Sequence, residues 1–290
     1  MPIPSTFSIV AYDPGEPAWG VAVASKFLAV GAVVPWARAG AGAVATQSYA
    51  NTSYGSEGLD LMESGLSADE ALHNLVTQDP EAPSRQAGMV DAQGRAATFT
   101  GGDCFEWAGG LTGDGFAVQG NILVGEQVIQ AMADAFVGGK AESIIWRLFH
   151  ALQAGDLAGG DRRGKQSAAI LVVKAQGGYG GLNDRWVDYR VDDHTDPVTR
   201  LGGLLELHEL YMGKSPSNDR IELKEEALMQ LQQIMQKKGY YSATAEGVYD
   251  TATRIALRAF IGNENFEERT DFESGWIDRP VFEYLLRRFE

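Results

Sequence analysis

The chain has a single cysteine, Cys104, in 290 residues. One cysteine cannot form an intramolecular disulfide, so the fold does not depend on an oxidising compartment. The four histidines are scattered and lack the spacing that metal ligands show. We therefore expect no metal site and no cofactor, and we expect the histidines to have structural roles.

Basic residues are also scarce. Lys and Arg total 24 against 39 Asp and Glu, which gives a formal net charge of −15. Nucleic acids and anionic membrane surfaces bind basic patches, so we exclude both as partners. No apolar run approaches the roughly 18 residues of a membrane span. No basic segment followed by an apolar run marks a signal peptide, so we expect a cytoplasmic protein.

Short apolar segments between Gly and Pro turn signals predict strands in the first two thirds of the chain. They cover 6–13, 18–25, 32–39, 42–48, 84–91, 95–100, 115–119 and 167–174. Helices are predicted at 51–64, from the capping-box pattern at Ser67 through Val76, and at 126–137, 142–154 and 195–211. Runs of strands followed by runs of helices favour layers over βαβ alternation. We expect two packed sheets with helices outside.

The last third of the chain differs in character. The segment 213–219 (GKSPSND) is polar and predicts a linker. Beyond it, helical patterns cover about 221–238, 250–261 and 278–289. We therefore divide the chain into a large domain, 1–212, and a small three-helix domain, 220–290.

Thr6 stands at the start of the first strand, close to the N-terminus. Enzymes that use an N-terminal Thr, Ser or Cys have this layout. The hydroxyl attacks an amide, and the α-amine of the same residue, with a pKa near ~8, takes the proton. Met1 to Ser5 precede Thr6, so a free amine requires their removal. A purely structural threonine in a strand is the alternative.

Three more candidates lie near the first strands. Ser25 and Lys26 end the second strand, where a loop could face a site. Arg38 lies in an apolar strand and needs a partner, because a buried unpaired charge is costly. It could lower the pKa of a nearby amine or hydroxyl, or form a structural ion pair.

Two later segments supply further candidates. Gln119 and Asn121 flank a glycine, and their amides could donate to an oxyanion or only shape a turn. The run 159–167 (GGDRRGKQS) is densely polar, and Arg162 and Arg163 in it could hold a substrate carboxylate. A mobile charged loop is the alternative, and the run lacks the pattern of a phosphate-binding loop.

The segments TFSIVAYDP, GVAVASKFLAVGAVVPWARAGAGAVATQSYAN, VQGNIL, AGDLAGGDRRGKQSAAILVV and YRVDDHTDPV together resemble the Domain of Unknown Function 1028 family. That family is similar in fold to the N-terminal-nucleophile (Ntn) hydrolases. The resemblance implies an α+β, four-layer αββα sandwich and a small amide or peptide-like substrate. It also implies Thr6 as the nucleophile, Arg38 near it, and Asp161 and Ser167 supporting the terminal amine.

The C-terminal part resembles a peptidoglycan-binding domain. Gly239-Tyr240-Tyr241, Gly247-Val248-Tyr249-Asp250 and the helix through Phe260 follow its pattern, although Glu246 stands where Asp is usual. The resemblance implies peptidoglycan fragments as partners. A helical module that mediates assembly is the alternative, and it would belong to a non-catalytic binding protein. By analogy with sandwich folds of this kind, we also expect a homo-oligomer.

Overall fold

The computed structural model describes residues 6–289, and its chain divides into two compact units, Met1–Leu204 and Leu205–Glu290. The division falls within helix α5 (Pro197–Met212). The linker expected at 213–219 stays a prediction. The two units are described separately below.

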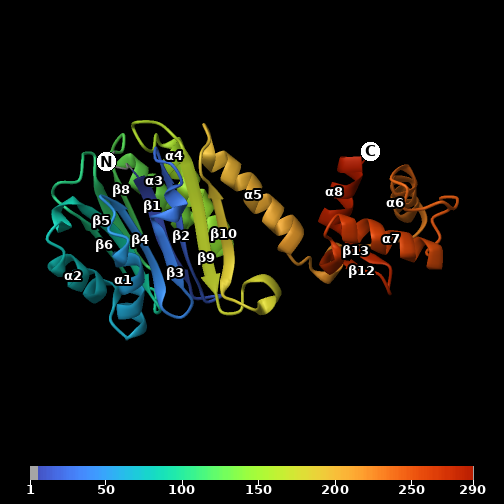
Figure 1. The fold of residues 1–290 in the computed structure, drawn as a ribbon, viewed down its shortest axis with the longest axis horizontal. Helices are drawn as coiled ribbons and strands as arrows, with labels where there is room; N and C mark the ends of the chain where they lie inside the picture. The colour runs from blue at the N-terminus through green and yellow to red at the C-terminus, as the bar shows by residue number, and fades with distance from the viewer. Residues whose placement is uncertain (1–5, 290) are drawn as a thin grey trace. The chain divides into compact units, whose positions relative to one another are not determined.

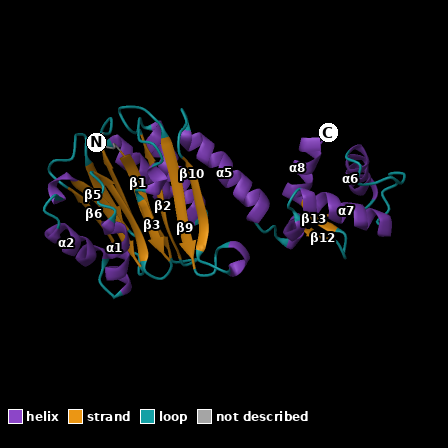
Figure 2. Cartoon of the chain, viewed as in Figure 1, coloured by secondary structure: helices purple, strands orange, loops and turns teal. Residues whose placement is uncertain are grey.

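Two antiparallel sheets form the first unit (Figures 1 and 2). The six-stranded sheet has the order β10-β9-β2-β1-β8-β7, and the four-stranded sheet has the order β3-β4-β5-β6. The strands of the larger sheet are β1 (Thr6–Asp13), β2 (Ala18–Ser25), β7 (Gly109–Gly113), β8 (Phe116–Asn121), β9 (Ser167–Lys174) and β10 (Arg185–Val191). Those of the smaller are β3 (Pro35–Arg38), β4 (Gly42–Ser48), β5 (Arg85–Asp91) and β6 (Ala96–Thr100).

Helices cover the outer faces of these sheets. α1 (Ser53–Glu63) and α2 (Ala68–Gln78) pack on the four-stranded sheet, and α3 (Gln127–Gly138) and α4 (Ile144–Leu157) pack on the six-stranded sheet. The expected capping box begins α2, where the Ser67 hydroxyl accepts from the Glu70 amide and the Glu70 carboxylate accepts from the Ser67 amide. The expectation of a mixed α+β fold is confirmed.

The inner faces of the two sheets meet across small apolar side chains. Val10, Val21 and Val23 of the larger sheet share a buried cluster with Ala43 and Ala45 of the smaller one. The alternation of side chains along a strand sends every second residue into this layer. Thr6 and Ser8 belong to the same face as Val10, so they also point between the sheets.

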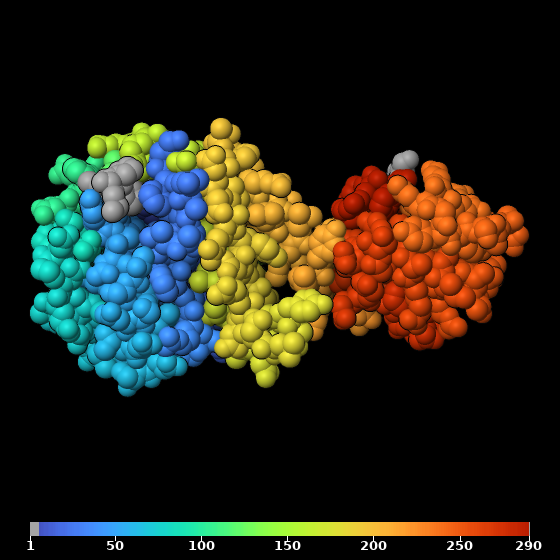
Figure 3. Space-filling view, viewed as in Figure 1, coloured from blue at the N-terminus to red at the C-terminus, as the bar shows by residue number. Residues whose placement is uncertain are grey.

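The surface of the first unit carries a few exposed apolar side chains. The connection between β9 and β10, residues 175–184, lies at this surface (Figure 3, yellow) and exposes Tyr179 and Leu182. Single exposed apolar residues are ordinary on folded proteins. None of the helices within residues 6–289 is both long and apolar enough to cross a membrane.

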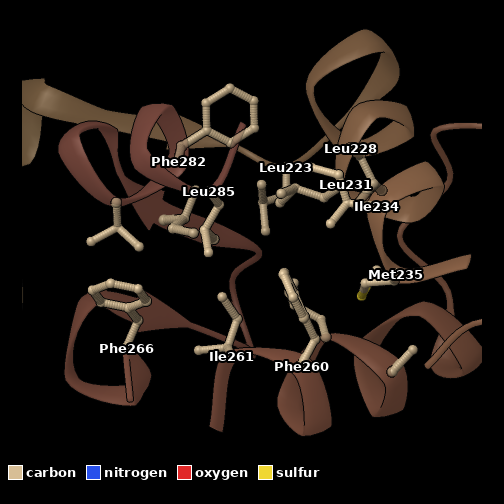
Figure 4. Packing of buried hydrophobic residues seen from close by; sticks show 14 of the residues in the cluster. Leu223, Leu228, Leu231, Ile234, Met235, Phe260, Ile261, Phe266, Phe282 and Leu285 are labelled. Carbon is tan, nitrogen blue, oxygen red and sulfur yellow. The ribbon is translucent and has the colours of Figure 1, made fainter. Parts of the chain in front are cut away.

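The second unit has three main helices and a small sheet. The helices are α6 (Glu225–Lys237), α7 (Thr251–Asn263) and α8 (Arg279–Phe289), and the strands are β11 (Arg220–Glu222), β12 (Thr270–Asp271) and β13 (Trp276–Asp278). Its core gathers one apolar face from each helix. In Figure 4, Phe260 and Ile261 of α7 point toward side chains of α6 and α8 such as Leu231 and Leu285.

A buried ion pair stabilises the second unit. The Arg269 guanidinium lies 2.6 Å from the Asp278 carboxylate, and both side chains are more than nine-tenths buried. Arg269 also donates to the carbonyl oxygens of Glu209 and Leu210, at the C-terminal end of α5, and to the Ser215 hydroxyl. One side chain therefore joins the end of a helix to the small sheet.

Replacing Arg269 by Leu should lower the free energy of unfolding of the second unit by about 3–5 kcal/mol, because the Asp278 charge then stays buried without its closest partner. Hydrogen exchange, followed by mass spectrometry on peptides from residues 220–289, measures this unit by itself. Arg279→Leu is the control. It removes an ion pair with Asp219 in which both side chains are exposed, and it should cost less than about 1 kcal/mol. Equal losses in the two variants would contradict a special role for Arg269.

Candidate functional site

Four candidates from the sequence lie side by side across the larger sheet, in a line that we call the hydroxyl row. Asn121 pairs with Thr6, Thr6 with Ser25, and Ser25 with Ser167, each on the neighbouring strand. All four side chains are buried. The Thr6 hydroxyl donates to the Ser25 hydroxyl across 3.2 Å. The residues before Thr6 lie outside the described part of the chain, so their removal stays a prediction.

Asp161 and Ser167 hold the loop that follows β2. One Asp161 carboxylate oxygen accepts from the Lys26 amide at 2.7 Å, and the other accepts from the Arg163 amide at 2.9 Å. The Ser167 hydroxyl donates to the Phe27 carbonyl at 2.5 Å and accepts from the Val30 amide at 3.1 Å. These contacts fix the loop beside the hydroxyl row. The predicted support of a terminal amine by Asp161 and Ser167 stays a prediction.

A small cavity of about 80 Å³ opens next to the row. Its walls combine apolar side chains with one ion pair, and it is lined by Phe7, Ala24, Ser25, Asp156, Gly159, Asp161, Gly164, Lys165 and Pro197. The Lys165 ammonium lies 2.5 Å from the Asp156 carboxylate. Burial alone would lower the pKa of Lys165, but Asp156 and Asp196 outweigh it and raise this pKa. The cavity therefore holds the Lys165–Asp156 ion pair beside Ser25.

The polar run 159–167 forms the loop at this cavity. Gly159 adopts a φ of +115°, and a Cβ there would lie 2.6 Å from a Val124 methyl carbon. Glycine is therefore required for the loop to approach the end of β8. The Arg163 guanidinium pairs with Asp161, and the Arg162 side chain is exposed. Lys26 is exposed as well, with its ammonium 3.3 Å from the Lys165 carbonyl.

Gln119 and Asn121 lie between the two sheets and do not line the cavity. The Gln119 amide donates to the Ser8 hydroxyl at 2.6 Å, and the Asn121 amide donates to Gln86 at 2.9 Å. Both side chains have no exposed surface. β8 directs the Gln119 side chain into the layer between the sheets, and its role as a substrate-binding residue stays a prediction. Asn121 belongs to the same buried cluster, although it is the partner of Thr6.

Arg38 lies at the opposite end of the smaller sheet. It pairs with Gly42 at the start of β4, whereas Gln47, which contacts the Thr6 carbonyl, lies five residues further along. At about 3.3 Å per residue the separation is roughly 17 Å. The Arg38 guanidinium instead forms ion pairs with Asp60 at 2.8 Å and Glu63 at 2.6 Å on α1. The structure thus shows the structural ion pair that was the alternative for Arg38, and it does not bring Arg38 to Thr6.

The sequence analysis missed Gln47 and Gln86, which come from β4 and β5 of the smaller sheet. Both are fully buried, and each lies in a strand whose central residues are mostly small or apolar. A glutamine among such neighbours is the signal that could have identified them, since buried polar groups require partners. Together with Ser8, Gln119 and Asn121 they make up a cluster that we call the intersheet amide cluster.

Unusual backbone conformations gather at the same end of the first unit. Ala29 (φ 52°), Ser48 (φ 64°) and Ile122 (φ 52°) are left-handed although none is glycine. They follow β2, end β4 and follow β8, respectively. Each such residue costs about 1–2 kcal/mol, and strain of this kind concentrates at functional sites.

Two further observations concern other possible sites. Among residues 6–289, no three His, Cys, Asp or Glu side chains are placed to hold a metal ion. A larger groove of about 510 Å³ lies along α1 and α2. Its lining includes none of the site residues expected from the sequence, although it includes Asp60, which pairs with Arg38. The hydroxyl row and its small cavity therefore remain the best candidate site.

Comparisons with known proteins agree with the extent of the first unit. The model of the "Family of unknown function (DUF1028)" matches residues 6–201. The chain belongs to this family. A crystal structure of a DUF1028 protein from Silicibacter pomeroyi is 32% identical, with a TM-score of 0.64, and the similarity covers 71% of this chain and 89% of that one. The family match begins at Thr6, the first residue of β1.

The second unit matches a different model, the "Putative peptidoglycan binding domain", over residues 211–285. Both resemblances found in the sequence are thereby confirmed. None of the curated proteins matches the chain.

Replacing Asp161 by Ala should lower the free energy of unfolding of the first unit by about 2–3 kcal/mol, because the Lys26 amide and the Arg163 guanidinium lose their acceptor. Urea unfolding followed by tryptophan fluorescence reports mainly this unit, which contains every tryptophan except Trp276. Asp60→Ala is the control, since Asp60 is exposed in its ion pair with Arg38 and its loss should cost under about 1 kcal/mol. An Asp161 variant as stable as the control would contradict the assigned contacts.

Proposed function

We propose that the first unit is an N-terminal-nucleophile amidohydrolase that acts on a small amide or peptide-like substrate, with Thr6 as the nucleophile. The observation that carries the proposal is the hydroxyl row, in which Thr6, Ser25 and Ser167 lie on adjacent strands and Ser25 lines a cavity. A volume of about 80 Å³ holds only two or three water molecules, which suits a small substrate group.

The proposed reaction needs Thr6 to be the first residue. Its α-amine takes the hydroxyl proton while Oγ attacks the carbonyl carbon of the substrate amide. As the C–N bond breaks, the protonated amine returns that proton to the leaving nitrogen, and an ester on Thr6 remains. Water, deprotonated by the same amine, then hydrolyses the ester and releases the acid. The base has a pKa near ~8 and needs no histidine.

The arrangement of layers supports this assignment by analogy. Helices α3 and α4, the six-stranded sheet, the four-stranded sheet, and helices α1 and α2 follow one another through the first unit. The order is consistent with the αββα sandwich that the family resemblance implies, and Thr6 begins a central strand of the larger sheet. Analogy of fold alone does not carry an activity, so the proposal depends on the row and its chemistry.

Replacing Thr6 by Ala should abolish amide hydrolysis while the melting temperature falls by only a few degrees, because one buried hydroxyl bond is lost. Turnover is measured on a panel of small amides and dipeptides by release of the amine. Intact mass of the wild-type protein should show a chain that begins at Thr6.

Thr46→Ala is the matched control. The Thr46 hydroxyl is also buried and also makes one hydrogen bond, to the Asn51 carbonyl, but it lies outside the row. This variant should keep its turnover. Full turnover in Thr6→Ala, or a wild-type chain that starts at Met1 or Pro2 and cleaves no amide, would favour a non-catalytic binding protein.

A second function is favoured by the domain match of the second unit, and we propose that this unit binds peptidoglycan fragments. The C-terminal turns of α6 and α8 carry a basic and aromatic patch, unusual in a chain of net charge −15. The Lys238 ammonium lies 4.6 Å from the Phe289 ring centre, and Arg288 lies over the Tyr284 and Phe289 rings. Sugar rings can stack on such aromatics, and stem-peptide carboxylates can pair with the cations.

Purified peptidoglycan should retain the full chain in a pull-down, and Lys238→Glu with Arg288→Glu should abolish retention. The control is Lys224→Glu with Arg279→Glu, which makes the same change of charge at exposed residues of the same unit. Loss of retention in both variants would indicate a general effect of charge. No retention of the wild-type chain would count against peptidoglycan as a partner.

A further inference from the structure

The layer between the two sheets changes character along the strands. At one end it is filled by small apolar side chains such as Ala43, Ala45 and Val10. At the end that contains Thr6 it is filled by the intersheet amide cluster, whose members have no exposed surface. Burying amides between sheets is unfavourable compared with apolar packing unless every group is paired. Stability alone therefore does not explain why polar side chains fill this end of the layer.

Asn121 belongs to both the row and this cluster, and Gln47 adds a contact to Thr6 itself. The Gln47 Nε2 lies 3.3 Å from the Thr6 carbonyl oxygen and donates to Gln86 Oε1 at 2.8 Å. Its Oε1 accepts from the Ser8 hydroxyl at 2.6 Å. Since Gln86 and Ser8 hold the two ends of the Gln47 amide, the second Nε2 hydrogen has one direction. It points toward two main-chain oxygens, that of Thr6 at 3.3 Å and that of Gln119 at 3.4 Å.

The position of Gln47 is itself determined by the neighbouring strands. Gln47 and Gln86 are direct partners on β4 and β5, and Gln86 also donates to the Gly120 carbonyl on β8 of the other sheet at 2.8 Å. Gly88 on β5 provides space, because a Cβ there would lie 2.0 Å from the Gln119 amide oxygen. The cluster thus ties the smaller sheet to β1, which carries Thr6, and to the neighbouring strand β8.

We propose that Gln47 is a positioning residue for Thr6: a side chain of the opposite sheet that fixes the Thr6 carbonyl and so aims its hydroxyl and amine. The inference rests on the proposed role of Thr6 as the nucleophile. The N, Cα, C and Cβ atoms of one residue form a rigid tetrahedral unit, so holding the carbonyl restricts the directions of the other two groups. Misplacement of a reacting group by about 1 Å can cost ~100-fold in rate.

The test compares Gln47→Met with Thr46→Ala in the full chain. The Gln47 variant removes the donor to the Thr6 carbonyl. The Thr46 variant removes a buried hydroxyl at the preceding position of β4, which donates to the Asn51 carbonyl, and it keeps the Gln47 donor. Acylation of Thr6 by a β-lactone is followed by intact mass, which separates the maximal rate from the probe concentration for half-maximal rate. Gln47→Met should lower the maximal rate ~10- to 100-fold at an unchanged half-maximal concentration. Thr46→Ala should change the rate less than about threefold.

A second measurement does not need catalysis. The carbonyl carbon of Thr6 is observed by NMR in uniformly labelled protein, and its chemical shift reports whether a donor contacts the oxygen. It should move in Gln47→Met and stay within the line width in Thr46→Ala. An unchanged shift, or a folded Gln47→Met protein acylated at the wild-type rate, overturns the positioning role. If the wild-type chain never reacts but the Thr6 carbonyl shift still depends on Gln47, the proposed function and the catalytic part of this inference are overturned. The contact between Gln47 and the Thr6 carbonyl is then still supported.

Discussion

The close approach of two sheets across small side chains is the constraint on which the candidate site depends. Ala43 and Ala45 on one sheet, and Ala117 and Ala169 on the other, keep the intervening layer thin. A thin layer lets an amide of β4 reach the main chain of β1, as Gln47 reaches Thr6. Bulkier residues at these positions would separate the sheets, and the contacts between Gln47, Ser8 and Gln86 would lengthen beyond hydrogen-bonding distance.

Most strands and helices of the first unit could be predicted from the sequence, and the exceptions have a common cause. β7 and β10 were missed, and they are the two edge strands of the larger sheet. β7 is a glycine-rich segment that is half-exposed, and in β10 (RWVDYRV) charged residues interrupt the apolar and aromatic ones. Edge strands are covered on fewer sides, so their sequences lack the apolar runs that identify central strands. The short strands of the second unit escaped prediction because two or three residues carry no period.

The sequence predicted only those residues of the candidate site whose position follows from their place in their own strand. Thr6, Ser25, Asn121 and Ser167 all stand at strand ends, and antiparallel pairing brings such ends together. Gln47 and Gln86 could not be placed in this way, because their contacts cross from one sheet to the other. Arg38 was misplaced for a related reason. Its strand was assigned correctly, but the register that puts it at the far end of β4 is a property of pairing between strands.

Several features that are unfavourable for folding lie together at the Thr6 end of the first unit. Three non-glycine residues there adopt left-handed conformations, a cluster of amides replaces apolar packing, and the Asp161 carboxylate is buried to hold one loop. Each feature alone has an ordinary structural explanation. Their coincidence at one end, while the other end of the same layer is filled by Val and Ala, is not expected if stability were the only requirement. A sequence optimised only for folding would extend the apolar layer to both ends, and the retained polar end therefore supports a site at Thr6.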